Sequence, residues 1–410
     1  MHILFLTDNF PPEVNAPASR TFEHCREWVK AGHQVTVITC FPNFPRGRVF
    51  DGYSNRLRQT ETMEGIRVIR VWSYITPNRG FLKRILDYVS YMLSAVLASP
   101  FVRKPDVVIG TSPQFFTACA ACFVSWLRGI PFVFELRDLW PESIKAVGAM
   151  RDSPVIKLLE RLELFLYRKA TLIVSVTGSF KGVLAGKGID PEKIRVVTNG
   201  VDLSRFKPRP KDPELVAQYG LNGKFVSGYV GTHGMAHALE TILYAAQAVQ
   251  TNGSADEYRF ILLGEGARKQ QLKELCTTMH LHNVIFIDSV PKDQVARYWS
   301  LLDVSIIHLK KTDLFKTVIP SKLFECMGMG IPVLHGVAGE SAEIVQKEGV
   351  GLTFEPEQPR ELCTKLTHLR ADRKLYETCR MHCRSASLRY DRSTMARKML
   401  EILSHLKEAV

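Results

Sequence analysis

The sequence has little of what marks a secreted, disordered or metal-dependent protein. Its nine cysteines are odd in number and lack the spacing of a disulfide framework, which favours a reducing, cytosolic environment. The opening residues MHILFLTDNFPPE have no basic segment and only a short apolar run, so no signal peptide is expected. No Asp-x-Asp motif occurs, and the CxxC pair Cys119 and Cys122 has no second cluster to complete a metal site. We therefore expect no metal.

Positive charge is concentrated in the first half of the chain. Residues 1–199 contain 26 Lys and Arg against 17 Asp and Glu, within a chain of 410 residues whose net charge is +13. Such an excess favours an anionic partner: a membrane surface, a phosphorylated lipid or a nucleic acid. No nucleic-acid-binding module is recognisable, so we expect no nucleic-acid partner.

Short apolar runs alternate with helical stretches along residues 1–200. The runs are typical of buried parallel strands, and the stretches between them are typical of helical crossovers. The expected strands are Ile3–Leu6, Gln34–Thr39, Asp106–Gly110, Phe132–Leu136, Leu172–Val176 and Ile194–Val197. An α/β, doubly wound parallel sheet is predicted for this half.

The alternation is interrupted by a proline-rich, charged segment and then resumes. Residues 199–213, NGVDLSRFKPRPKDP, read as a linker. Further strands are expected at Val226–Val230, Phe260–Leu263, Val284–Ile287, Val304–His308 and Ile331–Leu334. We predict two Rossmann-like domains, 1–200 and 201–387, with a terminal helix at about 388–410 packing back on the first. Ligands of such sheets bind at the carboxyl ends of strands, so the natural site is the cleft between the halves.

The segment PSKLFECMGMGIPVLHGVAGESAEIV, residues 320–345, has the pattern of a phosphate-binding unit. It predicts a helix with Ser321 as a possible N-cap, a strand, a glycine turn and a second helix. Backbone N–H groups at helix starts suit a phosphate. Lys322 and Glu325 lie three apart on one helical face, where they can serve a pyrophosphate and a ribose. The alternative is an ordinary surface ion pair.

A second apolar segment, residues 81–102, is flanked by basic residues. Lys83, Arg84 and Asp87 argue against a membrane span. Two readings remain for the segment: an interior helix of the first domain, or an amphipathic helix on an anionic membrane.

Four separated motifs resemble the retaining, metal-independent family-4 glycosyltransferases of GT-B fold. They are PPEVNAPASR, NGVDLSRF, LLGEGARKQQL and PSKLFECMGMGIPV, and the resemblance covers essentially the full length. The segment RDLWPES at residues 137–143, with GYVGTHGMAHALETILYAA and PSKLFE, resembles a bacterial subgroup that builds O-antigen and capsule sugars. That subgroup includes transferases for N-acetylated deoxyhexosamines such as N-acetylfucosamine.

The resemblance implies a donor site in the second domain. Glu325 matches the glutamate that binds the nucleotide's ribose, whereas Thr317 stands where the family has a first glutamate. The family's phosphate-binding arginine and lysine are missing after Gly231, and the N–H groups of residues 232–234, Lys322 or a protonated His233 are possible replacements. The implied donor-binding residues of this domain are Gly231, Thr232, His233, Gly234, Gly264, Glu265, Ser321, Lys322, Leu323 and Glu325.

The resemblance also implies residues in the first domain. Arg137 and Asp138 stand where the family has a histidine, and are the catalytic candidates; a structural Arg137–Asp138 pair is the simpler alternative. Asn15 and Pro17 are expected on the donor side. The expected acceptor contacts are Ser19, Arg20 and Trp140, with helix capping by Ser19 and core packing of Trp140 as alternatives.

The expected activity is retaining transfer of a sugar from a UDP-sugar to a polyprenyl-diphosphate-linked glycan, without a cofactor or a divalent metal. The expected location is the cytoplasmic face of the bacterial plasma membrane, contacted by the basic N-terminal half. Two other classes share the fold: a nucleotide-sugar 2-epimerase, which needs acid and base carboxylates around the sugar, and a non-catalytic nucleotide-sugar-binding protein.

Overall fold

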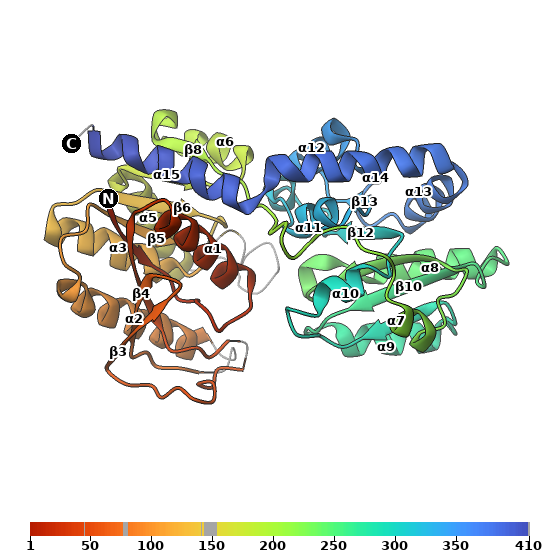
Figure 1. Cartoon of the computed structure of the whole chain (residues 1–410), viewed down its shortest axis with the longest axis horizontal. Coiled ribbons are helices and arrows are strands. Elements are labelled where there is room, and N and C mark those ends of the chain that lie inside the picture. The colour runs from red at the N-terminus through yellow and green to blue at the C-terminus, as the bar shows by residue number, and fades with distance from the viewer. Residues whose placement is uncertain (45, 77–80, 141, 143–153, 409–410) are drawn as a thin grey trace. The chain divides into compact units, whose positions relative to one another are not determined.

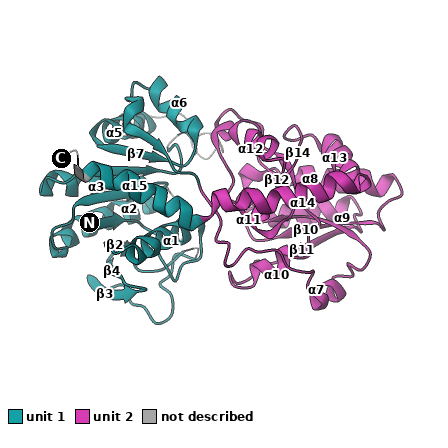
Figure 2. Ribbon diagram, turned by 45° about the horizontal axis from the view of Figure 1, so that its top comes forward, with its two compact units in different colours: residues 1–198, 392–410 teal, residues 199–391 magenta. Residues whose placement is uncertain are grey.

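The computed structural model describes residues 1–44, 46–76, 81–140, 142 and 154–408, and Figure 1 shows its helices and strands. Pro141 and Ser143 of the RDLWPES motif lie outside the described residues. The chain divides into two compact units, 1–198 with 392–410 and 199–391, coloured separately in Figure 2. The domain boundary expected at residue 200 lies two residues from this division.

Unit 1 is built on an eight-stranded sheet in the order β3-β4-β2-β1-β5-β6-β7-β8. Its neighbours pair in parallel except β3 with β4, which form an antiparallel edge hairpin. The strands are β1 (His2–Leu6), β2 (Gln34–Cys40), β3 (Arg58–Met63), β4 (Ile66–Val71), β5 (Val107–Thr111), β6 (Phe132–Leu136), β7 (Leu172–Ser175) and β8 (Ile194–Val196).

Helices cover both faces of this sheet. They are α1 (Ala16–Lys30), α2 (Phe81–Ala98), α3 (Phe115–Arg128), α5 (Pro154–Lys169), α6 (Gly178–Gly186) and α15 (Arg392–Glu408). The last helix of the chain packs against the first, as Figure 1 shows for α15 and α1. The indole Nε1 of Trp28 donates a hydrogen bond to Ala396 O at 2.8 Å, and Met399 and Leu403 are fully buried in the core.

Unit 2 contains a six-stranded parallel sheet in the order β11-β10-β9-β12-β13-β14. The strands are β9 (Phe225–Val230), β10 (Tyr258–Leu263), β11 (Val284–Ile287), β12 (Val304–His308), β13 (Val333–Gly336) and β14 (Gly351–Thr353). Its helices are α7 (Pro213–Gln218), α8 (Glu240–Thr251), α9 (Lys269–Thr278), α10 (Val295–Trp299), α11 (Lys322–Met329), α12 (Glu340–Glu348), α13 (Pro359–Ala371) and α14 (Arg373–Ser387). The doubly wound α/β prediction is confirmed in both units.

One predicted strand begins too early. Residues 331–334 were expected to be extended, but β13 starts at Val333. Gly330 ends α11 in the left-handed conformation, at φ +69°, and Ile331 N still donates to Cys326 O at 3.0 Å. The helix cap therefore uses the residues that the apolar run assigned to the strand.

Candidate nucleotide-sugar site

The loops after β9 and β10 lie against each other because both contain glycine. Gly231 N donates to Leu263 O at 2.8 Å. A Cβ atom on Gly264, whose φ is +144°, would lie 1.9 Å from Gly231 O. No other residue type fits this approach of two backbones. Gly231 and Gly264 are thus brought together at the carboxyl ends of parallel strands, where α/β sheets bind ligands.

Lys322 reaches across the Gly231 turn from the start of α11. A Cβ atom on Gly231 would lie 2.1 Å from Lys322 Cε and 2.5 Å from its Nζ. The ammonium stands 5.4 Å from the centroid of the Tyr229 ring. Burial lowers the pKa of Lys322, and the charge of Glu325 opposes this effect. Lys322 forms no ion pair with any described residue, which removes the surface ion pair as its explanation.

His233 does not carry the positive charge that was one of the two alternatives for this loop. Its side chain is buried, and burial together with the charge of Lys269 lowers its pKa to about 4, so the imidazole is neutral at pH 7. The His233 N–H donates to Glu265 O at 2.8 Å. The His233 amide therefore binds the neighbouring loop and is not available to an anion, whereas a role of the Thr232 and Gly234 amides stays a prediction. Of the two candidates for the charge, Lys322 remains.

Three further donor-site candidates, Thr232, Gly234 and Glu265, have contacts within the protein. Thr232 O accepts from Tyr229 Oη at 2.9 Å, and Gly234 is the N-cap residue of the 3-10 helix Met235–His237. Glu265 is exposed, but its Oε1 accepts from Lys269 Nζ at 2.6 Å. These contacts fix the loop around Gly231, and a direct contact of these residues with a donor stays a prediction.

The starts of α11 and α12 have no side-chain caps. Ser321 is the N-cap residue of α11, but its side chain accepts no backbone N–H; the N-cap residue of α12 is Gly339, which has no side chain. The prediction that Leu323 contacts the donor is wrong, because its side chain is fully buried and its N–H donates to Pro320 O at 3.0 Å. Phe324 N also donates to Ser321 O, at 3.1 Å, so the first turn of α11 already uses most of its N–H groups. Anion binding at the start of α12 stays a prediction.

Thr317, at the position of the family's first glutamate, contributes a local contact. Its Oγ1 donates to Leu314 O at 2.7 Å, inside the 3-10 helix Leu314–Thr317. The hydroxyl is therefore used by its own backbone.

In unit 1, the predicted donor-side loop is the start of a helix. Asn15 Oδ1 accepts from Ala18 N at 2.9 Å and caps α1, with Pro17 in the first turn. The Ala18 N–H is thus occupied by the cap. The helix begins at Ala16, because Pro17 is compatible with the first turn.

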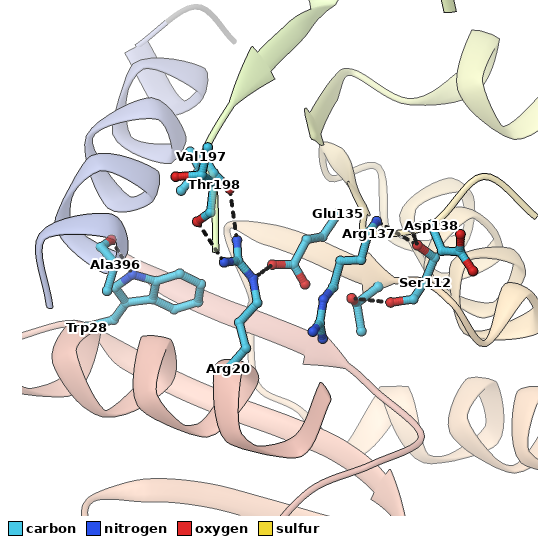
Figure 3. Close-up of polar contacts among 10 residues, drawn as sticks. Arg20, Trp28, Ser112, Glu135, Arg137, Asp138, Val197, Thr198 and Ala396 are labelled. Atoms are coloured by element: carbon cyan, nitrogen blue, oxygen red, sulfur yellow. Dashed lines mark hydrogen bonds and ion pairs between the residues drawn. The ribbon is translucent and has the colours of Figure 1, made fainter. Parts of the chain in front are cut away.

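Ser19 and Arg20 lie in the core, so their prediction as acceptor contacts is corrected. Ser19 Oγ donates to Asn15 O at 2.9 Å, and Ser19 does not cap the helix. Arg20 is 2% exposed and its Nε pairs with Glu135 Oε1 at 2.9 Å. Its other nitrogens donate to Thr198 O at 3.0 Å and Val197 O at 3.2 Å (Figure 3). Arg20 joins α1 to the ends of β6 and β8.

Arg137 is partly buried, and two nitrogens of its guanidinium have no hydrogen-bond acceptor among the described residues. The N–H groups of Arg137 and Asp138 donate to Ser112 Oγ at 2.8 and 3.3 Å, which fixes the turn after β6 (Figure 3). The Nε and Nη1 atoms of Arg137 are buried, and no described residue accepts from them. Burial lowers the pKa of Arg137 to about 10, against the attraction of Glu135, so it is charged at pH 7. The expected Arg137–Asp138 ion pair does not form among the described residues.

Trp140 stacks on Phe115, with ring centroids 4.9 Å apart. Its indole is only partly buried, so this contact fits the core-packing alternative and leaves the acceptor contact a prediction.

Three carboxyl groups that sequence reasoning did not single out gather beyond β1. Burial raises the pKa of Asp8, Glu13 and Asp87 to about 7. Glu13 Oε1 accepts from Asn43 N and Phe44 N, both at 2.8 Å. Asp8 could have been found from its position, because it lies two residues beyond the end of the first strand, where ligands of parallel sheets bind. Raised carboxyl pKa values are frequent at functional sites.

Within the described ranges, no group of three or more His, Cys, Asp or Glu side chains could hold a metal ion.

Both units match known protein families. Residues 18–205 match the family described as Glycosyltransferase Family 4, and residues 224–372 match Glycosyl transferases group 1. The Escherichia coli K12 protein WcaI, provisionally described as a colanic acid biosynthesis glycosyl transferase, is 25% identical over 341 residues, 80% of this chain and 82% of the relative. A GDP-mannose-dependent alpha-mannosyltransferase of Mycolicibacterium smegmatis is 23% identical over 388 residues, 92% of this chain and 90% of the relative.

Solved structures share the fold. Anabaena HepE, in complex with UDP and glucose, aligns with a TM-score of 0.73 at 18% identity, covering 98% of this chain and 99% of HepE. The two family matches follow one another along the two units, and the structural likeness is of the GT-B type. The chain thus has the GT-B fold, and each of its units matches a family of glycosyltransferases.

Proposed function

We propose that this protein transfers a sugar from a UDP-sugar to a hydroxyl of a polyprenyl-diphosphate-linked glycan, with retention of anomeric configuration, in the synthesis of a bacterial surface polysaccharide. The observation that carries the donor assignment is the Lys322 ammonium held over the Gly231 turn without an ion-pair partner among the described residues. A diphosphate at this turn would supply the counter-charge.

The leaving diphosphate is the group that needs stabilisation when the glycosidic bond breaks. Lys322 is proposed to supply the positive charge, and the start of α12, which has no side-chain cap, is proposed to supply N–H dipoles. Such preorganised groups stabilise developing negative charge at little reorganisation cost. Glu325 is proposed to bind the ribose, as its match to the family glutamate implies.

The uridine base is proposed because HepE, of the same fold, has been solved in complex with UDP and glucose. The mycobacterial relative is GDP-mannose-dependent, so guanine is the competing base. Polysaccharide synthesis is proposed because WcaI is described by that process. An N-acetylated deoxyhexosamine is proposed as the sugar on the segment around Arg137.

Arg137 is proposed to contact an anionic group of the reaction in unit 1, because its charged guanidinium has buried, unused donors. The acceptor lipid implies association with the inner face of the membrane through the basic N-terminal half. Among the described helices, none is both long and apolar enough to cross a bilayer.

The donor is tested by thermal-shift titration of the purified chain with UDP, GDP, CDP and ADP in EDTA. Selective stabilisation by UDP is expected. Selective stabilisation by GDP would replace the proposed base, and the absence of binding by all four would overturn the donor site. Product anomers, read by NMR of the glycan, test retention.

A further inference from the structure

Three helices of unit 1 share one face of its sheet. The connections β4–α2–β5, β5–α3–β6 and β6–α5–β7 all run in one direction along the strand order, and parallel crossovers are right-handed. They therefore place α2, α3 and α5 on the same face, where α2 packs against α3 and α3 against α5. The opposite face holds α1 and α15.

The outer side of this helical layer exposes large apolar side chains. More than half of the large hydrophobic residues that the described chain exposes lie on α2, α3, α5 and the short helix Ser99–Phe101. Trp126 is 74% exposed and Leu97 73%. The apolar helical face is defined here by Leu93, Leu97, Phe101, Phe123, Trp126 and Phe165. Because α2 contacts α3 and α3 contacts α5, these exposed side chains lie on neighbouring helices and are not scattered singly over the surface.

The helix α2 has two apolar sides, which accounts for its two readings in the sequence. Tyr91 and Ala95 are fully buried, and Tyr91 Oη donates to Thr7 O at 3.0 Å and Ile38 O at 2.9 Å. Leu86, Leu93 and Leu97, spaced by seven and four residues, are exposed on the other side. Packing against the sheet thus uses only half of the helix's hydrophobic surface.

The charges around this face have one predominant sign. Residues 81–104, 115–128 and 154–169 contain nine Lys and Arg against three Asp and Glu, a net charge of +6. Glu163 is buried, and Asp87 is partly buried with a pKa near neutrality. The exposed charge is therefore almost entirely basic, with apolar and aromatic side chains between the basic ones.

We infer that the apolar helical face is the surface by which unit 1 lies on an anionic lipid bilayer. Tryptophan and phenylalanine enter the headgroup region, while Lys and Arg keep their charges at the phosphates. A bilayer satisfies an apolar surface and a basic surface at once, and each basic side chain near anionic lipid adds to the attraction. The biological role of this surface rests on the proposed function, in which the acceptor is a membrane lipid. The evidence for the surface is its exposed apolar and basic side chains.

A basic cavity adjoins the face at its Phe101 end. Arg103 and Lys104 follow Phe101 and line a cavity of about 480 Å³ together with Arg67, His2 and His33. The cavity suits the phosphate of a lipid headgroup, which carries negative charge and accepts hydrogen bonds.

The test is sedimentation of the full-length protein with vesicles. Neutral phosphatidylcholine vesicles are compared with vesicles containing about one third phosphatidylglycerol, at low and high salt. We expect binding to the anionic vesicles only, weakened by salt. The double substitution Leu97→Ser and Trp126→Ser should weaken it about tenfold, which corresponds to the loss of roughly one buried side chain. Arg103→Gln with Lys104→Gln should weaken binding and reduce its salt dependence.

The matched control is Tyr244→Ser with Met381→Ser, two exposed residues on helices of unit 2, which should bind like the wild type. Thermal unfolding of each variant checks folding. Wild-type protein that ignores anionic vesicles overturns both the membrane association and this inference. Wild-type binding that the Leu97/Trp126 variant retains overturns the face alone. If the wild type is a dimer, the Leu97/Trp126 variant is a monomer and neither binds vesicles, the face is a protein interface. That outcome also overturns the inference. UDP titration of the same samples tests the donor site separately.

Discussion

Lys322 owes its position to a missing side chain. Its aliphatic chain occupies the volume that a Cβ atom on Gly231 would fill, so a substitution at either residue disturbs the same site. Sequence spacing placed Lys322 and Glu325 on one helical turn. It did not reveal that the lysine faces a glycine turn far away in the sequence, because that contact depends on how α11 packs beside β9.

Lys322→Ala should weaken UDP binding by about ten- to a hundredfold and uridine binding much less, because a charged contact contributes roughly 1.5–3 kcal/mol. Titration calorimetry measures both ligands. Lys347→Ala, an exposed lysine in the last turn of α12, is the control and should leave both affinities unchanged. Equal weakening of UDP and uridine would exclude a phosphate role.

Arg20 and Arg137 make a contrasting pair. Arg20→Gln breaks a buried ion pair and leaves Glu135 without its partner, which should lower the free energy of unfolding by about 3–5 kcal/mol. Arg137→Gln removes a guanidinium with unused donors, so stability should change by less than about 1 kcal/mol while transfer activity falls. Urea unfolding and turnover are the two measurements. A strongly destabilised Arg137→Gln would assign this residue to structure.

Asp8 should make stability depend on pH. Burial, with the charge of Asp87 nearby, raises its pKa to about 7, whereas an unfolded aspartate titrates near about 3.9. Between these values the folded state holds the extra proton, so the free energy of unfolding falls as the pH rises and levels off above about 7. Asp8→Asn removes this loss. Its advantage over wild type should grow from pH 4 to pH 7 and exceed about 1 kcal/mol at pH 8.

Thermal melts across this pH range measure the effect, with Asp51→Asn on the exposed surface as the control. An advantage that is the same at both ends of the range would contradict the protonation of Asp8 in the folded protein.

At the scale of elements, buried strands were predictable and the edge hairpin was not. Phe132–Leu136, Val284–Ile287 and Val304–His308 have the expected bounds because most of their residues are apolar, as in other strands of parallel sheets. The strand β3, RQTETM, is polar and alternates only between exposed and half-buried positions, so it has no hydrophobic signal. Its pairing with β4 at the sheet edge depends on tertiary contacts and not on the local preference of its residues for a strand.

The candidate site was predictable only as a set of segments. The motifs located the turns at Gly231 and Gly264 and the start of α11, because glycine and helix-start patterns are local. The sequence did not predict which hydrogen-bond donors and charges of these segments remain available to a ligand. The His233 N–H donates to Glu265 O, and Arg20 is buried in an ion pair with Glu135. Both contacts join segments that are distant in the sequence.

The helix α15 should carry much of the stability of unit 1. Met399 is fully buried in the cluster that contains Trp28 and the strands β1, β2 and β5. Met399→Ala should therefore cost about 2–5 kcal/mol, as for other buried large-to-small substitutions. Urea unfolding followed by tryptophan fluorescence measures this cost. Leu406→Ala, on the partly buried edge of the same cluster, should cost clearly less.

At the scale of the whole molecule, unit 2 is an insertion in unit 1. The chain enters unit 2 at residue 199 and leaves it at residue 391, and these two ends are neighbours: Val201 N donates to Tyr390 O at 2.9 Å, and Val201 forms a parallel bridge with Asp391. Each unit also has its own hydrophobic core.

Residues 199–391 should therefore fold alone, because insertions with adjacent ends are self-contained. A fragment of these residues is expected to unfold cooperatively and to bind UDP with an affinity that Lys322→Ala reduces, measured by calorimetry. A fragment that is unfolded would show that unit 2 needs unit 1 for stability.

The packing of α15 on α1 also fixes an order of events during translation. The ribosome completes unit 2 before it has made residues 392–410, so the surface around Trp28 stays uncovered while most of the protein is already synthesised. Unit 1, although encoded first, is the last to be finished, and a messenger that stops early at residue 391 yields a chain whose second half is complete and whose first half is not.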